Sequence, residues 1–314
     1  YLQMSEMIST RVAYGQALAE IGHDENIVVL DADLSKSTMT DTFKKKYPER
    51  HFNIGIAEAN MMAVAAGLAS CGKTVFASTF AMFAAGRAFD QVRNSIGYPH
   101  LNVKIAATHA GITVGEDGAS HQAIEDIALM RSIPGMTVVS PADAVATNAL
   151  VKQAAKMDGP VYLRLGRMNV PVIYPADAKF EIGKGVTLKD GKDITLIATG
   201  FMVAQALQAA EILEKEGILA RVIDIHTIKP IDAEIIVKAA KETGAIVTCE
   251  EHNVIGGLGS AVAEVLAKNF PVPAEMVGIE DVFGKSGKPA DLIKKYGLTP
   301  ENIAEKARKA LSRK

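Results

Sequence analysis

The sequence predicts an α/β protein with two domains, each built on a mostly parallel β-sheet covered by helices. The first observation behind this prediction is the length of 314 residues, which exceeds one ordinary domain. The second is an alternation of short, β-branched segments with longer segments of helical pattern. Such alternation is typical of parallel strands joined by crossover helices, with both faces of the sheet covered.

The first domain is predicted from a regular series of these elements. Its strands are expected at 26–33, 73–79, 102–109, 136–140 and 161–167. Its helices are expected at 57–70, 81–96, 122–133 and 143–156. The first strand, NIVVLDAD, is apolar and ends in carboxylates, and the first helix is rich in Ala, Met and Leu, as a buried helix would be.

The alternation breaks in the segment MNVPVIYPADAKFEIGKG, whose prolines and glycines fall outside any periodic pattern. We therefore expect a first domain over 4–172, a linker over 173–187 and a smaller second domain over 188–314. The second domain shows strand patterns at 193–200, 220–228 and 244–252, and a helical pattern at 202–217. Tyr1–Gln3, before Met4, look like the remnant of an expression tag and are left out of the fold.

Composition excludes several classes of function. The net charge is -2 and both signs are mixed along the chain, whereas nucleic acids and anionic membranes are bound by concentrated basic surfaces. No apolar run approaches the roughly 20 residues of a membrane span. Cys71 and Cys249 lie far apart and are expected to be reduced thiols. We expect a cytoplasmic protein with neither a nucleic-acid nor a membrane partner.

Polar and aromatic residues stand at the ends of the predicted strands of the first domain. In chain order they are Asp31, Asp33, Phe80, His109, Arg164 and Arg167. Because ligands bind at the carboxyl ends of parallel strands, these positions are candidates for a site. The fold alone does not say which chemistry occurs there.

Glu58 and the pair Phe80 and Phe83 each allow two interpretations. A carboxylate at a helix start commonly complements the helix dipole, which is the more usual case, whereas the apolar neighbours of Glu58, such as Ile54 and Met61, are compatible with a buried group that shares a proton with a ligand. Phe80 and Phe83 have helical spacing, which is usual for core residues, yet such a pair could also stack on a flat heteroaromatic ring.

The glycine-rich segment GITVGEDGASHQ, residues 111–122, carries Asp117 and His121 shortly after His109. Two histidines beside an acid on one loop are compatible with a structural turn and with a substrate pocket. Their spacing matches no zinc or calcium motif, so no metal site is predicted in this chain. Arg11, Arg164 and Arg167 carry the planar group that suits phosphate.

Taken together, these segments resemble the C-terminal half of a transketolase. The similarity runs through TRVAYGQAL, DADLSKS, FNIGIAEANMMAVAAGLA, STFAMF, ATHAGITVGEDGASHQAIEDIALMRSIPGM, RLGRMNVP and EEHNVIGGLGSAVAE. The THxGxxxGEDGxxHQ pattern is specific, whereas GGLGS alone would be weak. The resemblance implies a thiamine diphosphate pyrimidine-binding fold followed by a transketolase C-terminal-like fold.

The resemblance also implies a role for each site residue. Glu58 would hydrogen-bond the aminopyrimidine of thiamine diphosphate, Phe80 and Phe83 would wall the pyrimidine pocket, and Asp33 would lie near the thiazolium. Asp117 would bind the substrate hydroxyls, and His121 would act at the reacting carbonyl. The implied sugar-phosphate cradle consists of His109, Arg11, Arg167 and Ser37, and the implied catalytic residues are Glu58, His121 and His109.

Three positions depart from the family pattern. The Arg and His usual on either side of the glutamate are Ala57 and Ala59, and a third aromatic of the pocket is replaced by Gly86. The Gly-Asp-Gly motif that holds the cofactor diphosphate through Mg²⁺ (or Ca²⁺ or Mn²⁺) is also lacking from the sequence.

We therefore expect the C-terminal subunit of a split transketolase, whose N-terminal partner chain holds the metal and diphosphate. Self-association through a dimer core would give a heterotetramer. The enzyme would transfer a two-carbon ketol unit between sugar phosphates.

Other assignments remain open at this point. The chain could be the C-terminal part of 1-deoxy-D-xylulose-5-phosphate synthase, although His109 stands where that family usually has arginine. It could be the β subunit of a 2-oxoacid dehydrogenase E1 component, against which GEDGASHQ and Arg167 argue. A non-catalytic regulatory homologue would be expected to have lost residues such as Glu58 and Asp117, which are present.

Overall fold

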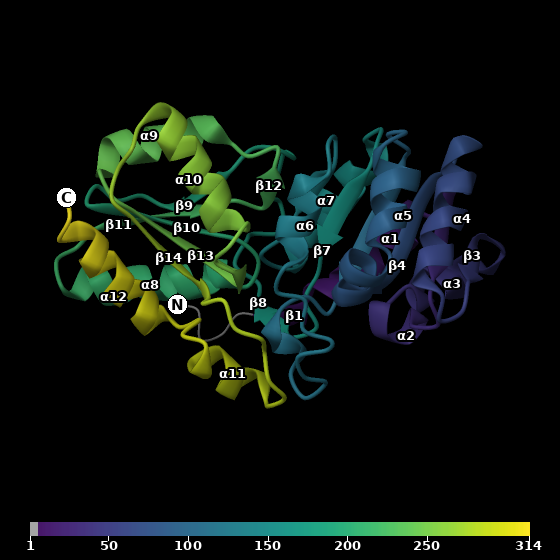
Figure 1. Ribbon diagram of the computed structural model, residues 1–314, viewed down its shortest axis with the longest axis horizontal. Helices are drawn as coiled ribbons and strands as arrows, with labels where there is room; N and C mark the ends of the chain where they lie inside the picture. The colour runs from purple at the N-terminus through teal and green to yellow at the C-terminus, as the bar shows by residue number, and fades with distance from the viewer. Residues whose placement is uncertain (1–5) are drawn as a thin grey trace.

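The computed structural model describes residues 6–314, so Tyr1–Gln3 and the expected domain start at residue 4 lie outside the described residues. Two α/β units lie side by side along the long axis of the molecule (Figure 1). The purple-to-teal unit holds the first part of the chain, and the green-to-yellow unit holds the second. The predicted α/β class with two mostly parallel sheets is confirmed.

The first unit contains, within the described residues, a seven-stranded sheet of order β12-β6-β7-β5-β4-β2-β3. Its strands are β2 (Ile27–Asp31), β3 (His51–Asn53), β4 (Thr74–Phe80), β5 (Val103–Thr108), β6 (Thr137–Val139), β7 (Val161–Arg164) and β12 (Thr227–Lys229). All neighbours except β12 and β6 run parallel. Every residue of β2 is buried, as expected for a parallel strand covered on both faces.

Helices cover both faces of this sheet. They are α1 (Thr10–Ile21), α2 (Ser35–Thr38), α3 (Asp41–Lys46), α4 (Glu58–Ser70), α5 (Phe89–Gln91), α6 (Asp126–Ser132) and α7 (Ala144–Lys156). Residues of α1, α3 and α7 belong to one hydrophobic cluster, and residues of α4 and α6 belong to another. Because side chains alternate along a strand, β2 contributes to both clusters, through Val29 to one and through Leu30 to the other.

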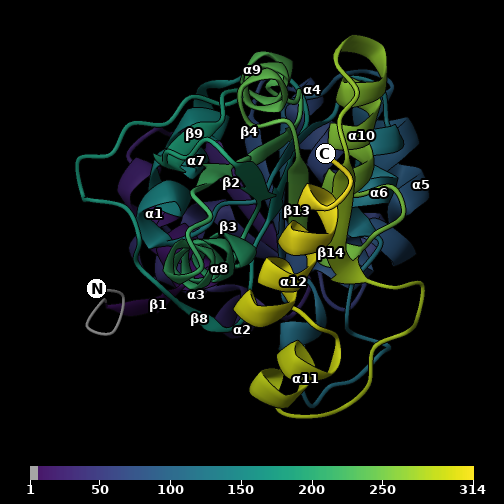
Figure 2. The same cartoon turned by 90° about the vertical axis from the view of Figure 1, so that its left-hand side faces the viewer.

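The second unit has a five-stranded sheet of order β14-β13-β10-β11-β9 in the described residues. Its strands are β9 (Val186–Lys189), β10 (Ile194–Ala198), β11 (Ala220–Asp224), β13 (Ile246–Asn253) and β14 (Ala274–Ile279), and only β9 runs antiparallel. The helices are α8 (Met202–Lys215), α9 (Ala233–Thr243), α10 (Leu258–Asn269), α11 (Pro289–Lys295) and α12 (Pro300–Leu311). Figure 2 shows α12 at the front, with α8 to its left and α11 below it.

Backbone pairing joins the two units. The single strand expected at 220–228 is wrong: β11 ends at Asp224, and β12 pairs antiparallel with β6 in the first sheet. The amide of Ser140 also donates to the carbonyl of His226 at 2.8 Å. Periodicity cannot reveal this change of sheet, because β-branched residues recur in both halves of the segment.

The segment between the two sheets is anchored at both ends. Its first part forms β8 (Asn169–Pro171), which pairs antiparallel with β1 (Met7–Ser9) near the chain start. The Asp143 carboxylate accepts the amides of Ile173 and Tyr174 at 2.8 and 2.9 Å. The sheet of the second unit resumes with β9 at Val186.

Two of the predicted helices differ in the structure, and both differences lie beside the predicted site. The segment expected as one helix at 81–96 is helical but irregular, with π-helical turns at Phe83–Arg87 and Val92–Gly97 on either side of the short α5. Phe80 is the last residue of β4, so Phe80 and Phe83 do not share a helix. The helix expected at 122–133 begins only at Asp126, because the preceding residues bond to the 111–122 loop.

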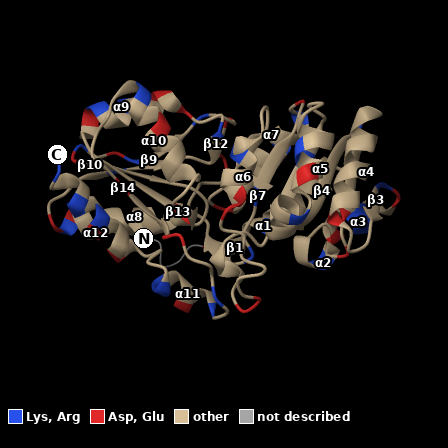
Figure 3. Cartoon of the chain, viewed as in Figure 1, with Lys and Arg blue, Asp and Glu red and all other residues tan. Residues whose placement is uncertain are grey.

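Surface features agree with the composition. Lys and Arg are interspersed with Asp and Glu over both units (Figure 3). No helix within residues 6–314 has the length and apolar character needed to cross a membrane.

Candidate active site

The strand order places the predicted site residues along one edge of the first sheet. The adjacent strands β7, β5, β4, β2 and β3 are parallel, so their carboxyl ends lie side by side. The residues at or just beyond these ends are Arg167, His109, Phe80, Asp33 and Glu58. The sheet thus gathers residues that lie more than one hundred positions apart in the sequence.

Two phenylalanines and two histidines form an aromatic cluster at the centre of this edge. The rings of Phe80 and Phe83 stack with centroids 5.7 Å apart and an interplanar angle of 20°. The His109 ring stacks on Phe80 at 3.8 Å, and the His121 ring meets the Phe83 ring edge-on at 5.3 Å. The cluster thus joins the end of β4 to His109, just before the 111–122 loop, and to His121, near the end of that loop.

His109 occupies a constrained position. Its φ of 58° lies in the left-handed region, which His adopts more readily than most residues. The Thr108 hydroxyl lies 2.9 Å from Nδ1 of His109 in a hydrogen bond. Burial, reinforced by the positive charges of Arg11 and Arg167, lowers the pKa of His109 to about 3. The imidazole is therefore neutral at physiological pH.

Glu58 is buried at the first position of α4, which agrees with one of its two interpretations, and it has an ion-pair partner that the sequence did not predict. Nη1 of Arg87 lies 3.1 Å from each carboxylate oxygen of Glu58. The guanidinium carbon of Arg87 also lies 4.3 Å from the centre of the Phe83 ring. Arg87 looks like an ordinary surface residue in the sequence, and only the π-helical turn at Phe83–Arg87 aims it at Glu58.

A cationic group lies on the other side of the aromatic cluster. Arg11, in the first turn of α1, donates from Nη1 to the carbonyl of Ser37 at 2.8 Å. Nη1 of Arg167 lies 3.8 Å from a carboxylate oxygen of Asp117. The hydroxyl of Thr10 accepts the amide of Gly166 at 2.8 Å, so the start of α1 is fixed beside the end of β7. Burial, together with the charge of Arg167, lowers the pKa of Arg11.

Two of the residues considered from the sequence lie outside these groups. Arg164 is buried, and its Nε donates to Asp126 at 2.8 Å, so it holds the fold rather than facing a ligand. Asp33 is exposed at the far end of the edge and accepts a hydrogen bond from Asn53 at 2.9 Å. The other predicted site residues belong to the aromatic cluster, to the ion pair of Glu58 beside it, or to the cationic group.

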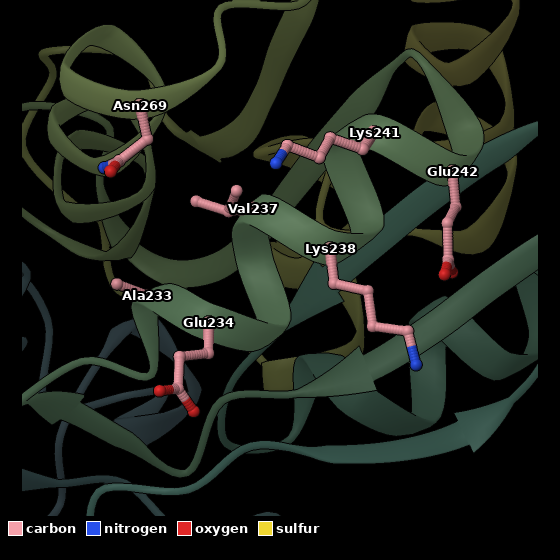
Figure 4. Close-up of a pocket in the computed structure, with 7 residues that line it drawn as sticks. All are labelled: Ala233, Glu234, Val237, Lys238, Lys241, Glu242 and Asn269. Carbon is pink, nitrogen blue, oxygen red and sulfur yellow. The ribbon is translucent and has the colours of Figure 1, made fainter.

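An open groove of the second unit lies away from this site. It has a volume of about 520 Å³ and is formed by α9 and the end of α10 (Figure 4). Its lining residues are Ala233, Glu234, Val237, Lys238, Lys241, Glu242 and Asn269. It shares no residue with the candidate site, so the assignment of the site depends on the chemistry at the strand ends and not on cavity size.

The described residues contain no group of three or more His, Cys, Asp or Glu side chains that could hold a metal ion. Single side chains of these types do occur in the site, among them Glu58, Asp117 and His121.

Comparison with known proteins identifies the family to which this architecture belongs. Residues 6–172 match the transketolase pyrimidine-binding domain, and residues 183–303 match the transketolase C-terminal domain. A putative transketolase C-terminal section from Methanocaldococcus jannaschii is 55% identical over 300 residues, covering 94% of this chain and 94% of that protein. A 6-deoxy-6-sulfo-D-fructose transketolase subunit from a Clostridium species is 46% identical, covering 93% of this chain and 90% of that protein.

A solved structure supports the same conclusion. A split-gene transketolase described as an inactive β4 tetramer has 60% sequence identity and a TM-score of 0.92, covering 98% of this chain and 99% of that chain. The chain therefore belongs to the transketolase family, and it consists of the pyrimidine-binding and C-terminal domains of that family.

Proposed function

We propose that this chain is the C-terminal subunit of a two-chain transketolase that uses thiamine diphosphate to transfer a two-carbon ketol unit from a ketose phosphate to an aldose phosphate. One observation carries the proposal. The rings of Phe80 and Phe83 stack on each other, and Arg87 contacts both the Phe83 ring and the buried Glu58. His109 stacks on Phe80 and experiences the positive charge of Arg11. The reaction requires three features in one place: an aromatic surface for the flat ring of the cofactor, a carboxylate that shares a proton with that ring, and a group that binds phosphate.

The residues present fit the pyrimidine end of the cofactor. Phe80 and Phe83 offer aromatic faces, against which a heteroaromatic ring can stack. Glu58 is only 2% exposed, so a hydrogen bond from its carboxyl group to a ring nitrogen would form away from bulk water. When bound, thiamine diphosphate supplies the electron sink for cleavage of the carbon–carbon bond. The chain supplies orientation and proton positions.

Arg87 bonds to the same oxygens that a ring nitrogen would use. Its side chain is 52% exposed and can swing outward, whereas that of Glu58 cannot. We infer that cofactor binding exchanges the hydrogen bonds from Arg87 for one between Glu58 and a nitrogen of the pyrimidine ring, with the proton shared between them, while the cation stays near enough to balance the buried carboxyl group.

The cationic group suits a sugar phosphate. Nε of Arg11 is buried and has no hydrogen-bond partner among the described residues, so a donor is available for an anionic ligand. Arg167 supplies a second guanidinium, and Ser37 lies on the short helix α2, whose backbone Arg11 contacts. His109 is neutral and would therefore orient the substrate by hydrogen bonding, with the charge supplied by the arginines.

The reacting end of the substrate would lie under the 111–122 loop. Asp117 can accept hydrogen bonds from sugar hydroxyls. His121 would hold a proton at the carbonyl oxygen, since its ring projects toward Phe83 and the site of the cofactor. Asp33 would contribute at the thiazolium side of the same edge.

A partner chain completes the proposed enzyme. The sequence lacks the Gly-Asp-Gly motif for the diphosphate and its metal ion, and its relatives are described as a C-terminal section and a subunit. We propose an N-terminal subunit that carries this motif, with two copies of each chain. The inactive β4 tetramer of the similar protein supports self-association without activity. Cys71 and Cys249 are free thiols, consistent with a cytoplasmic enzyme.

Reconstitution tests this function. The chain alone and the chain with its N-terminal subunit are assayed for ketol transfer with thiamine diphosphate and Mg²⁺. Activity is expected only in the complex. Activity of the chain alone would disprove the two-chain proposal, and a complex that decarboxylates a 2-oxo acid but transfers no ketol unit would favour the alternative enzymes.

A further inference from the structure

The 111–122 loop lies between the active site and the C-terminal unit. Although rich in glycine, it is not a free surface turn, since residues 111–115 are buried. One side of the loop presents Asp117 to Arg167 and His121 to Phe83. The opposite side is in contact with the second unit over much of its length.

Glu251, on β13 of the second unit, reaches under the start of the loop. Its Oε1 accepts the amide of Thr113 at 2.7 Å, and its backbone carbonyl accepts Nη2 of Arg164 at 2.9 Å. A Cβ atom on Gly111 would overlap the Glu251 carboxyl group. Gly111 also has a φ of 80°, so glycine is required there for its conformation and for the close approach of Glu251.

Gln122, at the end of the loop, contacts another segment of the second unit, the one that contains Lys285. Its Nε2 donates to the carbonyls of Ile112 and Gly115, each at 3.2 Å, and to the carbonyl of Lys285 at 2.9 Å. A Cβ atom on Gly284 would overlap Oε1 of Gln122. One side chain thus closes the loop on itself and attaches it to the segment before α11.

Ser286 makes a third attachment near the loop tip. Its hydroxyl donates to the carbonyl of Glu116 at 2.6 Å, next to Asp117. Pro289, at the start of α11, lies beside Gly115, where an added Cβ would be 3.2 Å from the proline ring. The attachments therefore span the loop from Thr113 to Gln122.

We propose that the C-terminal unit positions the substrate-facing side of the loop, with Glu251, Gln122 and Ser286 as positioning residues that hold Asp117 and His121 in place. The second unit then contributes to catalysis without placing the side chain of Glu251 or Ser286 against the reacting atoms. The effect on turnover rests on the proposed function, whereas the attachment itself can be tested without it.

Hydrogen exchange of the subunit complex tests the attachment. Replacing Glu251 with Ala removes the acceptor of the Thr113 amide, whereas Glu251→Gln keeps an oxygen in the same place. We expect exchange of the 111–122 amides to accelerate at least about tenfold in E251A and to stay near the wild-type rate in E251Q. Unchanged protection in E251A would overturn the proposal.

A second variant guards against loss of folding and tests the kinetic effect. Gly284→Ala displaces Gln122, whereas the neighbouring control, Gly287→Ala, brings a Cβ only to 3.2 Å from the flexible end of Leu292. In the active complex, G284A is expected to raise KM for the ketose phosphate by about fivefold or more, with G287A near wild type. A purely structural defect would instead lower kcat at unchanged KM, and that result would overturn the proposal.

A double variant identifies the route through Gln122. Because the overlap involves only that side chain, G284A combined with Gln122→Ala should be no worse than Gln122→Ala alone. Additive losses would overturn the assigned contact. If the wild-type complex transfers no ketol unit, the proposed function fails, and the exchange measurement still decides whether the loop is held in this way.

Discussion

Nη1 of Arg87 lies 3.1 Å from both carboxylate oxygens of Glu58, and its guanidinium also covers the face of the Phe83 ring. The pair joins a carboxylate that is almost completely buried to a cation that is half exposed. The buried partner cannot leave, so any ligand that needs Glu58 must compete with Arg87. This relationship leads to the first two predictions.

Replacing Glu58 with Gln should leave the fold intact and remove most of the activity of the complex. Gln keeps the shape and one acceptor oxygen but loses the charge and the proton exchange that a general acid–base group provides. We expect kcat to fall by about 10² to 10⁴, measured as ketol transfer at saturating substrate. A variant with full activity would contradict the catalytic assignment of Glu58.

Replacing Arg87 with Ala should tighten binding of thiamine diphosphate. The donor that occupies Glu58 is removed, and because Arg87 is half exposed we expect a gain of only about 1 kcal/mol, or about fivefold in Kd. Arg93→Ala is the matched control, since Arg93 is exposed and bonds Asn94. Calorimetric titration of both complexes with cofactor measures the difference, and weaker binding by R87A than by R93A would show that Arg87 assists the cofactor.

A third aromatic residue can be restored at Gly86. An added Cβ would meet only the terminal methyl of Met82, which is flexible, and the backbone of Gly86 is not in the left-handed region. We expect Gly86→Tyr to strengthen cofactor binding by about 1 kcal/mol through ring stacking. Gly86→Ala controls for the change in backbone freedom, and equal affinity of the two variants would show that the pocket is not completed from this position.

His109 should remain neutral well below neutral pH. Burial and the nearby arginines lower its pKa to about 3 in the folded state, below its value of 6.5 in the absence of these effects. The resulting stability is present above about pH 6.5 and is lost as the pH falls toward 3, because the unfolded state binds the proton first. Imidazole NMR signals assigned with a His109→Asn variant should show no titration above about pH 5. Titration near pH 6.5 would disprove the buried environment.

Denaturation provides a second measure of the same effect. Between about pH 7 and 4.5, the wild-type protein should lose about 2 kcal/mol more unfolding free energy than His109→Asn. Equal losses in the two proteins would contradict the assignment to His109.

Glu251 should show the opposite pH dependence. Burial raises the pKa of the Glu251 carboxyl group to about 7. Arg164 and the Thr113 amide act to lower this pKa, and the negative charge of Asp126 acts to raise it. The folded state binds this proton more strongly than the unfolded state. The contribution to stability is therefore present below about pH 4.5 and lost as the pH rises through 7.

The comparison with Glu251→Gln isolates this contribution, because Gln does not titrate. Going from about pH 5 to 8.5, the wild-type protein should lose about 2 kcal/mol of unfolding free energy relative to E251Q, measured in urea. A constant difference between the two proteins over this range would show that Glu251 does not carry the raised pKa.

The sequence by itself determined the fold class, the family and much of the site. Alternating strand and helix patterns require a covered parallel sheet, and residues at strand ends, such as His109 and Phe80, are brought to one edge by that topology alone. The position and apolar neighbours of Glu58, at the start of α4, left two interpretations open, and the resemblance to the family selected the one in which it binds the cofactor.

Only the tertiary structure decided which side chains meet. Arg87 reaches Glu58 because a π-helical turn rotates it there, Arg164 is taken by Asp126, and Glu251 approaches Gly111 from the other unit. Local patterns report burial and periodicity of the chain near each residue. The distance between Glu251 and Thr113, which are separated by 138 positions, depends instead on how the two sheets pack.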